Sequence, residues 1–289
     1  MTSGDVVDSG DSRATTARLQ VLAAALLFST GGAAIKATAL SAWQVASFRS
    51  GIAALALVVA LRPARWWGAR SLLVGAAYAA TMVLYVAGNK LTTAANTIFL
   101  QSTAPMYLLL LGPLVLGERI RRMHVGLTAV VAVGMGLFFV GIEAPLATAP
   151  DPMRGNVLAA VAGLTWALTI LGLRWLDGSG GSALASVVAG NVWAFVVCLP
   201  LALPVERVRP VDAALVLFLG VCQIGVAYVF LTRGVRHVPA LEASLLLLLE
   251  PVLNTVWAWL LHGETPGPWS SAGCAVILAA TVAWSLRQR

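Results

Sequence analysis

Two polar side chains in an apolar stretch near the C-terminus have types and a spacing that could bind or transfer a charged group. Glu250 and Asn254 are four residues apart, which places them on one face of a helix, and Trp257 continues the stripe. In the middle of a membrane span, a charged carboxylate costs about 2.5–3.5 kcal/mol, so it must face a cavity, pair, or be protonated. Glu250 is therefore a candidate for proton exchange or for binding an ammonium group. A protonated glutamate bonded to a neighbouring helix is the structural alternative.

Aromatic and polar residues recur at helical spacing in a second stretch, as Tyr78, Met82, Tyr85 and Asn89. A buried tyrosine needs a partner for its hydroxyl, while its ring can stack on an apolar or aromatic solute. Core packing explains such a stripe equally well. The residues that would complete an aromatic cavity are Phe28, Trp166 and Tyr228, with Gln223 at the position that matches Tyr78 in the second half of the chain.

Two prolines lie near the middle of apolar stretches, at Pro105 and Pro251. In a helix, each would remove a hydrogen-bond donor and collide with the carbonyl four residues earlier, at Gln101 and Leu247. A freed carbonyl at membrane depth needs a partner, which a water-filled or solute-filled cavity supplies. A kink that improves helix packing is the alternative interpretation.

The elements that must position these residues follow from composition, since 59% of the 289 residues are apolar and 11% are charged. Average soluble domains have roughly 45–50% and about 25%. Apolar stretches of about 20 residues, long enough to cross a bilayer, recur along the chain. We expect them at residues 18–38, 42–61, 71–90, 94–116, 123–142, 155–175, 183–204, 211–232, 240–262 and 268–286. Their backbone groups must pair internally and the alternation of a barrel is absent, so the sequence predicts an all-α polytopic membrane protein with ten transmembrane helices.

The basic residues indicate orientation rather than nucleic-acid binding, although the formal net charge is +7. They are scattered between apolar stretches and form no continuous basic face. With both termini on one side, thirteen of the 19 Lys and Arg residues fall on that side, five fall on the other, and Arg49 lies within a span. The positive-inside rule therefore predicts cytoplasmic termini.

An internal repeat links the two proline-containing stretches. Pro105 is followed twelve residues later by Gly117-Glu118, and Pro251 by Gly263-Glu264. A unit of five spans leaves the membrane opposite to the side where it enters, so a second copy must be inverted, as in many secondary transporters. The predicted organisation is a flexible tail at 1–17, a first repeat at 18–142, an extracytoplasmic linker at 143–154, a second repeat at 155–286 and a C-terminus at 287–289.

The Ser47-Phe48-Arg49 segment, the apolar run into Glu250-Pro251 and the paired Pro and Gly-Glu helix ends resemble the EamA group of the drug/metabolite transporter superfamily. The resemblance covers roughly residues 18 to 286, and the overall pattern is most similar to bacterial exporters of amino acids, including aromatic ones. It implies two inverted repeats around a central cavity, export by alternating access, and a location in the cell (inner) membrane. The implied partners are a small-molecule substrate, the lipid bilayer and, as a candidate coupling ion, the proton.

Efflux of cationic drugs or other metabolites is the alternative within this superfamily, and a channel is a more distant one. An enzyme is not expected, because the sequence has neither a His-Glu-x-x-His motif nor a Gly-x-Ser-x-Gly elbow. No cofactor or metal is expected, and we expect a monomer. The candidate substrate-binding residues are Tyr78, Tyr85, Gln101, Trp166, Gln223, Tyr228, Glu250 and Asn254, and the candidate helix-bending residues are Pro105 and Pro251.

Several charged residues have simpler interpretations. Arg49 lies seven residues into its span, about 10 Å at 1.5 Å per residue, and could extend its guanidinium to the interface or pair with another group. Glu118 and Glu264 follow helix-terminal glycines and are expected to hold helix ends, with gating as the lesser option. Glu242, near the end of its span, is expected to be a boundary residue.

Overall fold

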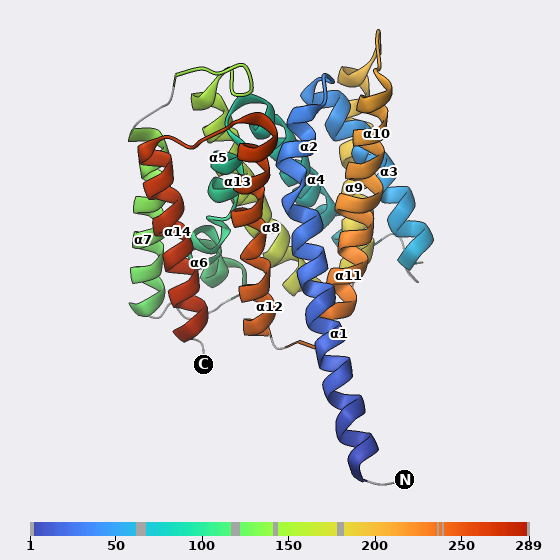
Figure 1. Cartoon of the computed structure of the whole chain (residues 1–289), viewed down its shortest axis with the longest axis vertical. Coiled ribbons are helices and arrows are strands. Elements are labelled where there is room, and N and C mark those ends of the chain that lie inside the picture. The colour runs from blue at the N-terminus through green and yellow to red at the C-terminus, as the bar shows by residue number, and fades with distance from the viewer. Residues whose placement is uncertain are drawn as a thin grey trace.

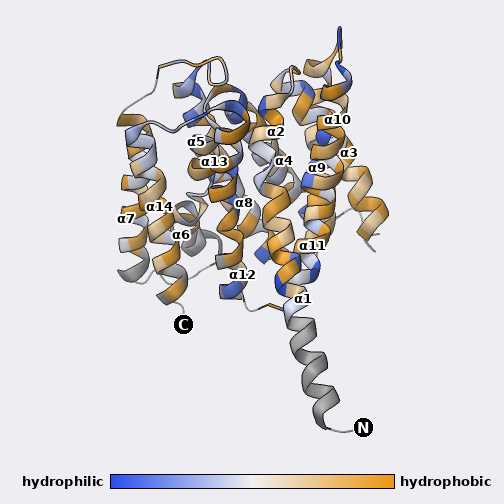
Figure 2. Cartoon of the chain, viewed as in Figure 1, coloured by the Kyte–Doolittle hydropathy of each residue, from blue (hydrophilic) through white to orange (hydrophobic). Residues whose placement is uncertain are grey.

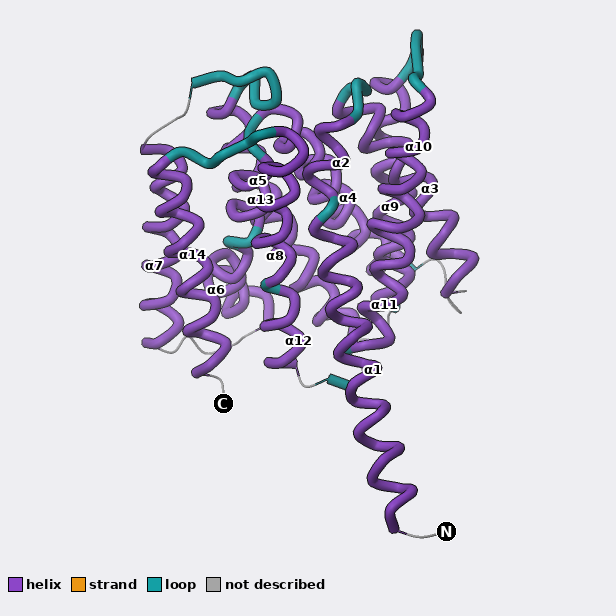
Figure 3. Tube along the Cα trace, viewed as in Figure 1, coloured by secondary structure: helices purple, strands orange, loops and turns teal. Residues whose placement is uncertain are grey.

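The computed structural model describes residues 3–61, 68–116, 122–140, 144–177, 182–235, 237–238 and 240–287, and it is a bundle of helices (Figure 1). Among these residues the only extended pairing is an isolated bridge between Leu146 and Ala149, and Figure 3 shows helices joined by loops. The prediction of an all-α protein is confirmed for the described part of the chain.

The first half of the chain forms seven helices within the described residues. These are α1 (Ser3–Ser29), α2 (Gly31–Ala37), α3 (Ala42–Leu61), α4 (Ala69–Leu91), α5 (Ala94–Gln101), α6 (Ala104–Leu116) and α7 (Arg122–Val140). The second half forms α8 (Pro152–Asp177), α9 (Ala183–Ala202), α10 (Pro210–Phe218), the π-helical η1 (Leu219–Val226), α11 (Ala227–Gly234), α12 (Ala240–Leu247), α13 (Leu249–His262) and α14 (Pro268–Arg287).

Six helical stretches are long and apolar enough to cross a membrane within the described ranges. They are Thr15–Ala37, Ala42–Leu61, Ala69–Leu91, Pro152–Leu176, Ala183–Ala202 and Pro210–Gly234, and two shorter apolar helices cover Val125–Val140 and Pro268–Ala283. Large apolar side chains such as Leu55, Val59 and Leu261 are exposed on the outside, whereas Asn89, Asn191 and others are fully buried. Figure 2 shows that apolar residues predominate along the helices. This distribution suits a bundle whose surroundings are lipid, because a soluble fold would place the amides outside and the apolar residues inside.

Three of the elements are interrupted near their middle. The helix at the N-terminus breaks between α1 and α2 at Thr30, two residues separate α5 from α6, and one residue separates α12 from α13. The last two interruptions fall just before Pro105 and Pro251. A proline disfavours helical geometry in the residue before it and removes a helical hydrogen bond, which accounts for the position of these breaks.

The contacts between helices occur in corresponding pairs across the two halves. In one such set, α4 of the first half packs against α8 and α9 of the second half. The segment that corresponds to α4 is η1 with α11; of these, α11 packs against α1 and η1 packs against α3. Likewise α8 contacts α5 and α6, and α1 contacts α12 and α13. The last elements of the two halves, α7 and α14, pack against each other. The sequence repeat is therefore matched by a repeated packing pattern.

The flexibility predicted for the N-terminal tail at residues 1–17 stays a prediction, and the described residues of this segment are helical. Helix α1 begins at Ser3 and continues without interruption into the membrane-length stretch, and it projects from the bundle in Figure 1. Extending an existing helix adds one backbone hydrogen bond per residue, whereas starting a new one is costly. The segment contains no proline that would stop this extension.

Candidate functional site

A cavity of about 380 Å³ lies between the two halves of the chain. Its walls come from α1, α3, α4, α5, α8, α9, η1, α11, α12 and α13. Among the described residues, α3 contributes only Arg49 and α9 contributes only Val187. Such a volume accommodates a small organic solute, since ligand cavities run from about 300 to 1,000 Å³.

Seven of the eight candidate substrate-binding residues line this cavity. They are Tyr78, Tyr85, Gln101, Trp166, Gln223, Tyr228 and Glu250. They come from six helical elements, α4, α5, α8, η1, α11 and α13, in both halves of the chain, so their convergence is a property of the fold. Their roles in binding remain predictions, because the structure holds no solute.

An aromatic cluster forms one wall of the cavity. The ring of Tyr228 lies edge-on to Phe28, with centroids 5.3 Å apart, and to Tyr78, with centroids 6.2 Å apart. Edge-to-face pairs of this kind hold the rings in fixed orientations. The wall can therefore receive an apolar or aromatic group without first having to order these rings.

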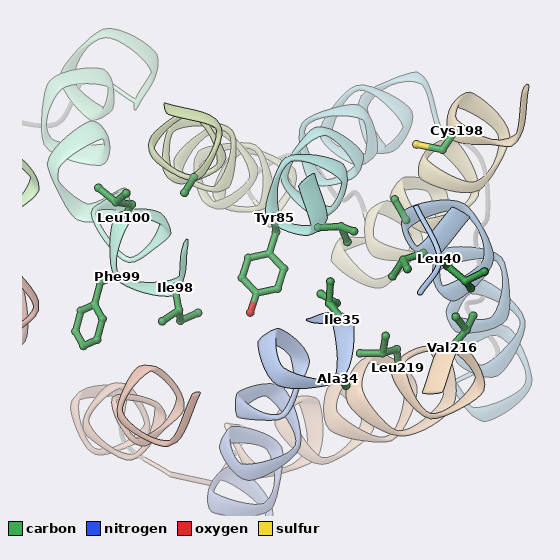
Figure 4. Packing of buried hydrophobic residues seen from close by; sticks show 14 of the residues in the cluster. Ala34, Ile35, Leu40, Tyr85, Ile98, Phe99, Leu100, Cys198, Val216 and Leu219 are labelled. Carbon is green, nitrogen blue, oxygen red and sulfur yellow. The ribbon is translucent and has the colours of Figure 1, made fainter. Parts of the chain in front are cut away.

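The eighth candidate, Asn254, lies behind the cavity and not in its lining. It is fully buried, and its Nδ2 donates to the hydroxyl of Tyr85 over 3.1 Å. Figure 4 shows Tyr85 pointing into the space between Ile98 of α5 and Ile35 of α2. Asn254 acts on the cavity by positioning Tyr85 and does not itself face the lumen.

The backbone of Gly32 packs tightly beside Asn254. A Cβ at this position would lie 2.7 Å from Asn254 Oδ1 and 2.9 Å from the Cβ of Ala94. Only glycine permits so close an approach here. α2, α5 and α13 therefore pack closely together beside Asn254.

Gln223 is placed by the π-helical segment η1 within the run from α10 to α11. Its Nε2 donates to the carbonyl of Phe28 over 3.4 Å, next to the break between α1 and α2. A π-helical turn inserts an extra residue per turn and occurs frequently at functional sites. The sequence periodicity predicts only an ordinary helix at 211–232, so this feature was missed.

The breaks between α5 and α6 and between α12 and α13 open onto the cavity. Gln101 and Ser102 line it at the end of α5, and Leu247, Leu248 and Pro251 line it around the start of α13. A second cavity, of about 210 Å³, shares Ser102, Trp166, Leu248 and Pro251 with the first and also contacts Pro105. The interrupted segments α5–α6 and α12–α13 thus line both cavities, which are close together.

Glu250 is partly buried and faces the cavity. None of the ion pairs found among the described residues includes it. The sequence left open that Glu250 pairs with a basic side chain, and no such pair is found in the described part of the chain. A carboxyl group that faces a cavity without a counter-ion can bind a cation or exchange a proton.

Arg49 also lines the cavity, and its side chain does not extend to the membrane interface. It is 1% exposed, its Nη2 donates to the carbonyl of Met82 over 3.2 Å, and its Cζ lies 6.0 Å from the centroid of the Tyr85 ring. Arg49 lies on the face of α3 that packs on α4, which directs its side chain inward. The sequence shows how far along its span Arg49 lies, but it does not show that the side chain points inward.

A buried ion pair joins distant parts of the chain near the ends of α2 and α13. Lys36 Nζ lies 2.8 Å from Glu264 Oε1, and both side chains are 2% exposed. Lys36 also donates to the carbonyls of Thr92 and Thr148 over 2.8 and 2.5 Å, and the Ala94 amide donates to Glu264 Oε2 over 3.0 Å. Glu264 thus holds a helix end, as the sequence predicts, and it does so by pairing with Lys36.

Gly263 precedes this glutamate at a φ of 67°, in the left-handed region that favours glycine, and it ends α13 there. The matching Gly117-Glu118 pair lies outside the described residues. Among the described residues, no group of three or more His, Cys, Asp or Glu side chains could hold a metal ion.

Comparison with known proteins gives the following. A sequence model described as the EamA-like transporter family matches residues 15–140 and 153–286. A solved crystal structure of a protein is similar in fold, with a TM-score of 0.60 and 19% sequence identity over 94% of this chain and 97% of the other. Among curated protein sequences, none matches this chain.

Proposed function

The chain belongs to the EamA-like transporter family, and we propose that it is a secondary transporter that exports small metabolites, in particular amino acids including aromatic ones, by alternating access. It is a multi-pass membrane protein with transporter repeats in both halves. The observation that carries the proposal is the cavity between those halves, which is lined by an aromatic cluster and by a carboxyl group that has no basic partner in the described residues.

The proposed architecture has ten spans. Joining α5 to α6 and α12 to α13 across their short breaks gives two further stretches of membrane length, and the shorter α7 and α14 complete the count. The corresponding helix contacts in the two halves support two five-span repeats of opposite orientation. In such transporters one half rocks against the other around a site near the midplane. The excess of basic residues on one side supports cytoplasmic termini in a cell membrane.

Efflux of organic cations is the second candidate function, because Glu250 could bind a cation directly. Arg49 in the same cavity opposes it, since a bound cation would meet a like charge in a site of low dielectric. An amino acid has both an ammonium and a carboxylate group, which suits a cavity that contains both charges.

Transport by the purified protein in liposomes tests the proposal. We expect efflux of radiolabelled L-phenylalanine that saturates with concentration and is accelerated by unlabelled solute on the opposite side. A channel would show neither property. Loss of countertransport together with linear flux would reject the carrier mechanism.

The role of Glu250 is tested with Glu250→Gln, in which the amide replaces the protonated carboxyl in shape and can donate a hydrogen bond. If Glu250 exchanges protons, pH-dependent net efflux is lost while solute-for-solute exchange survives. If it binds the substrate ammonium, both modes fail. The matched control is Glu242→Gln, which removes a carboxylate from a partly exposed pair with Arg18 and should change neither mode. Wild-type behaviour of Glu250→Gln would leave this residue with a structural role only.

A further inference from the structure

The guanidinium of Arg49 is a buried cation that the fold leaves incompletely paired. Among the described residues, no carboxylate forms an ion pair with it. Its Nη2 donates to one carbonyl oxygen, that of Met82, and approaches the sulfur of the same residue at 3.7 Å, while its Nε is buried without a hydrogen-bond partner. An arginine offers five donors in a planar fork. Most of this capacity is therefore free for a ligand.

The other contacts of Arg49 are too weak to compensate the charge. The Met82 carbonyl belongs to α4, where helical carbonyls already accept a backbone hydrogen bond. The Tyr85 ring is 6.0 Å from Cζ, at the outer limit of a cation–π contact. An uncompensated charge in a buried site is strongly destabilising. An anionic group in the cavity would relieve this, and Arg49 faces that cavity.

From these observations we infer that Arg49 is the binding site for the carboxylate group of the transported solute, and that the transporter selects solutes that carry one. The inference rests on the proposed function and deepens it. The guanidinium fork matches a carboxylate, with two parallel hydrogen bonds of fixed geometry.

The composition of the cavity favours a carboxylate over a phosphate. Among the described residues that line it, Arg49 is the only basic one, and Glu250 lines the same space. A phosphate group with two negative charges would be neutralised only in part and repelled by Glu250. A zwitterion is instead neutral overall: its carboxylate is attracted to Arg49 and its ammonium to Glu250, and an apolar side chain suits the wall formed by the Phe28, Tyr78 and Tyr228 rings.

A structural role for Arg49, as a clamp between α3 and α4, makes a different prediction. Removing a clamp would weaken the binding of every solute alike, because the cavity itself would change shape. Removing a carboxylate site weakens the binding of only those solutes that carry a carboxylate group. The two roles are therefore separated by ligands that differ in one functional group.

The experiment measures the thermal stabilisation of the purified full-length protein by three probes at a series of concentrations. Bound ligand stabilises the folded state in proportion to the logarithm of its concentration over Kd, so each series yields an apparent Kd. The probes are L-phenylalanine, 3-phenylpropionate, which lacks the ammonium group, and 2-phenylethylamine, which lacks the carboxylate. The variants are Arg49→Gln and Arg49→Lys. The matched control is Arg70→Gln, because Arg70 is exposed and lies near the start of α4.

We expect Arg49→Gln to raise the Kd of 3-phenylpropionate and L-phenylalanine about 10- to 150-fold, the range for losing a hydrogen bond to a charged group. The Kd of 2-phenylethylamine should stay within about twofold, or fall because a like charge is gone. Arg49→Lys should bind the two carboxylates with intermediate affinity, since it keeps the charge but not the fork. Arg70→Gln should match the wild type for all three probes.

Three results would overturn the inference. They are an unchanged Kd of 3-phenylpropionate in Arg49→Gln, an equal loss for all three probes, and wild-type protein that binds 2-phenylethylamine as tightly as L-phenylalanine. The proposed function fails separately, in liposomes. A wild-type protein that carries amines by saturable countertransport would remain a transporter while the carboxylate site is rejected. One that binds carboxylates through Arg49 but transports nothing would keep the site and lose the function.

Discussion

Removing one partner of the buried pair of Lys36 and Glu264 should lower the free energy of unfolding by several kcal/mol. Both side chains are 2% exposed, and removing one partner of a buried pair costs about 3–5 kcal/mol because the other charge stays buried. Glu264→Gln should lie near the lower value, since the Gln carbonyl can still accept from the Ala94 amide and Lys36 keeps two carbonyl acceptors. Lys36→Met should lie near the upper value, since Glu264 then retains the Ala94 amide alone.

The assay is a double-mutant cycle measured by reversible unfolding in mixed micelles titrated with a denaturing detergent. Once one charge is gone, removing the second should cost little more, so we expect a coupling energy of about 2–3 kcal/mol. The control cycle uses Arg18 and Glu242, whose side chains are 48% and 34% exposed. Exposed pairs contribute about 0–1 kcal/mol. A Lys36–Glu264 coupling no larger than that of the control cycle would refute the reasoning.

Exchanging the two charges should not restore stability. The position of Lys36 is surrounded by the carbonyl oxygens of Thr92 and Thr148, and that of Glu264 by the amide of Ala94. Lys36→Glu with Glu264→Lys would place a carboxylate against acceptors and an ammonium group against a donor. Recovery of stability in the exchanged variant would show that Coulomb attraction alone matters and that the hydrogen bonds do not.

Three further outcomes follow from the structure. Reporter fusions after Arg289 should show a cytoplasmic location and fusions at Asp151 an extracytoplasmic one; any other pattern rejects the inverted repeat. Trp166→Ala should reduce efflux of bulky apolar solutes more than that of small ones, because stacking and buried area are lost; equal loss would indicate misfolding. Gly190→Ala should lower the free energy of unfolding by about 1–3 kcal/mol, because its Cβ would lie 2.7 Å from the Gly75 carbonyl, whereas Gly136→Ala, with no atom within 4 Å, should not.

The sequence predicts those parts of the site that depend on local pattern. Tyr78 and Tyr85 were found from helical spacing, and the structure brings both to the cavity because residues seven apart share one helix face. The prolines marked positions where backbone hydrogen bonding changes, and the helices are interrupted just before each of them. In each case the signal lies within two turns of one helix, where geometry follows from the chain itself.

The missing parts depend on contacts between distant segments. Lys36 and Glu264 are brought together by the fold, and neither residue has a local pattern that indicates its partner. The inward direction of Arg49 depends on which face of α3 packs on α4, and an apolar span with little amphipathicity does not reveal that face. The π-helical segment that orients Gln223 has no proline or other marker in its sequence.

A last prediction concerns how binding drives transport. Arg49 belongs to the first half of the chain and Glu250 to the second, and both face one cavity. A ligand shifts a conformational equilibrium only as far as its affinities for the two states differ. A zwitterion that contacts both residues in one conformation but not in the other therefore shifts the equilibrium between the two conformations. A solute with one charged group contacts only one half. We expect 3-phenylpropionate to bind wild-type protein yet to exchange across liposomes at least about tenfold more slowly than L-phenylalanine at equal occupancy. Equal exchange rates at equal occupancy would show that the conformational change does not need a solute that bridges the two halves.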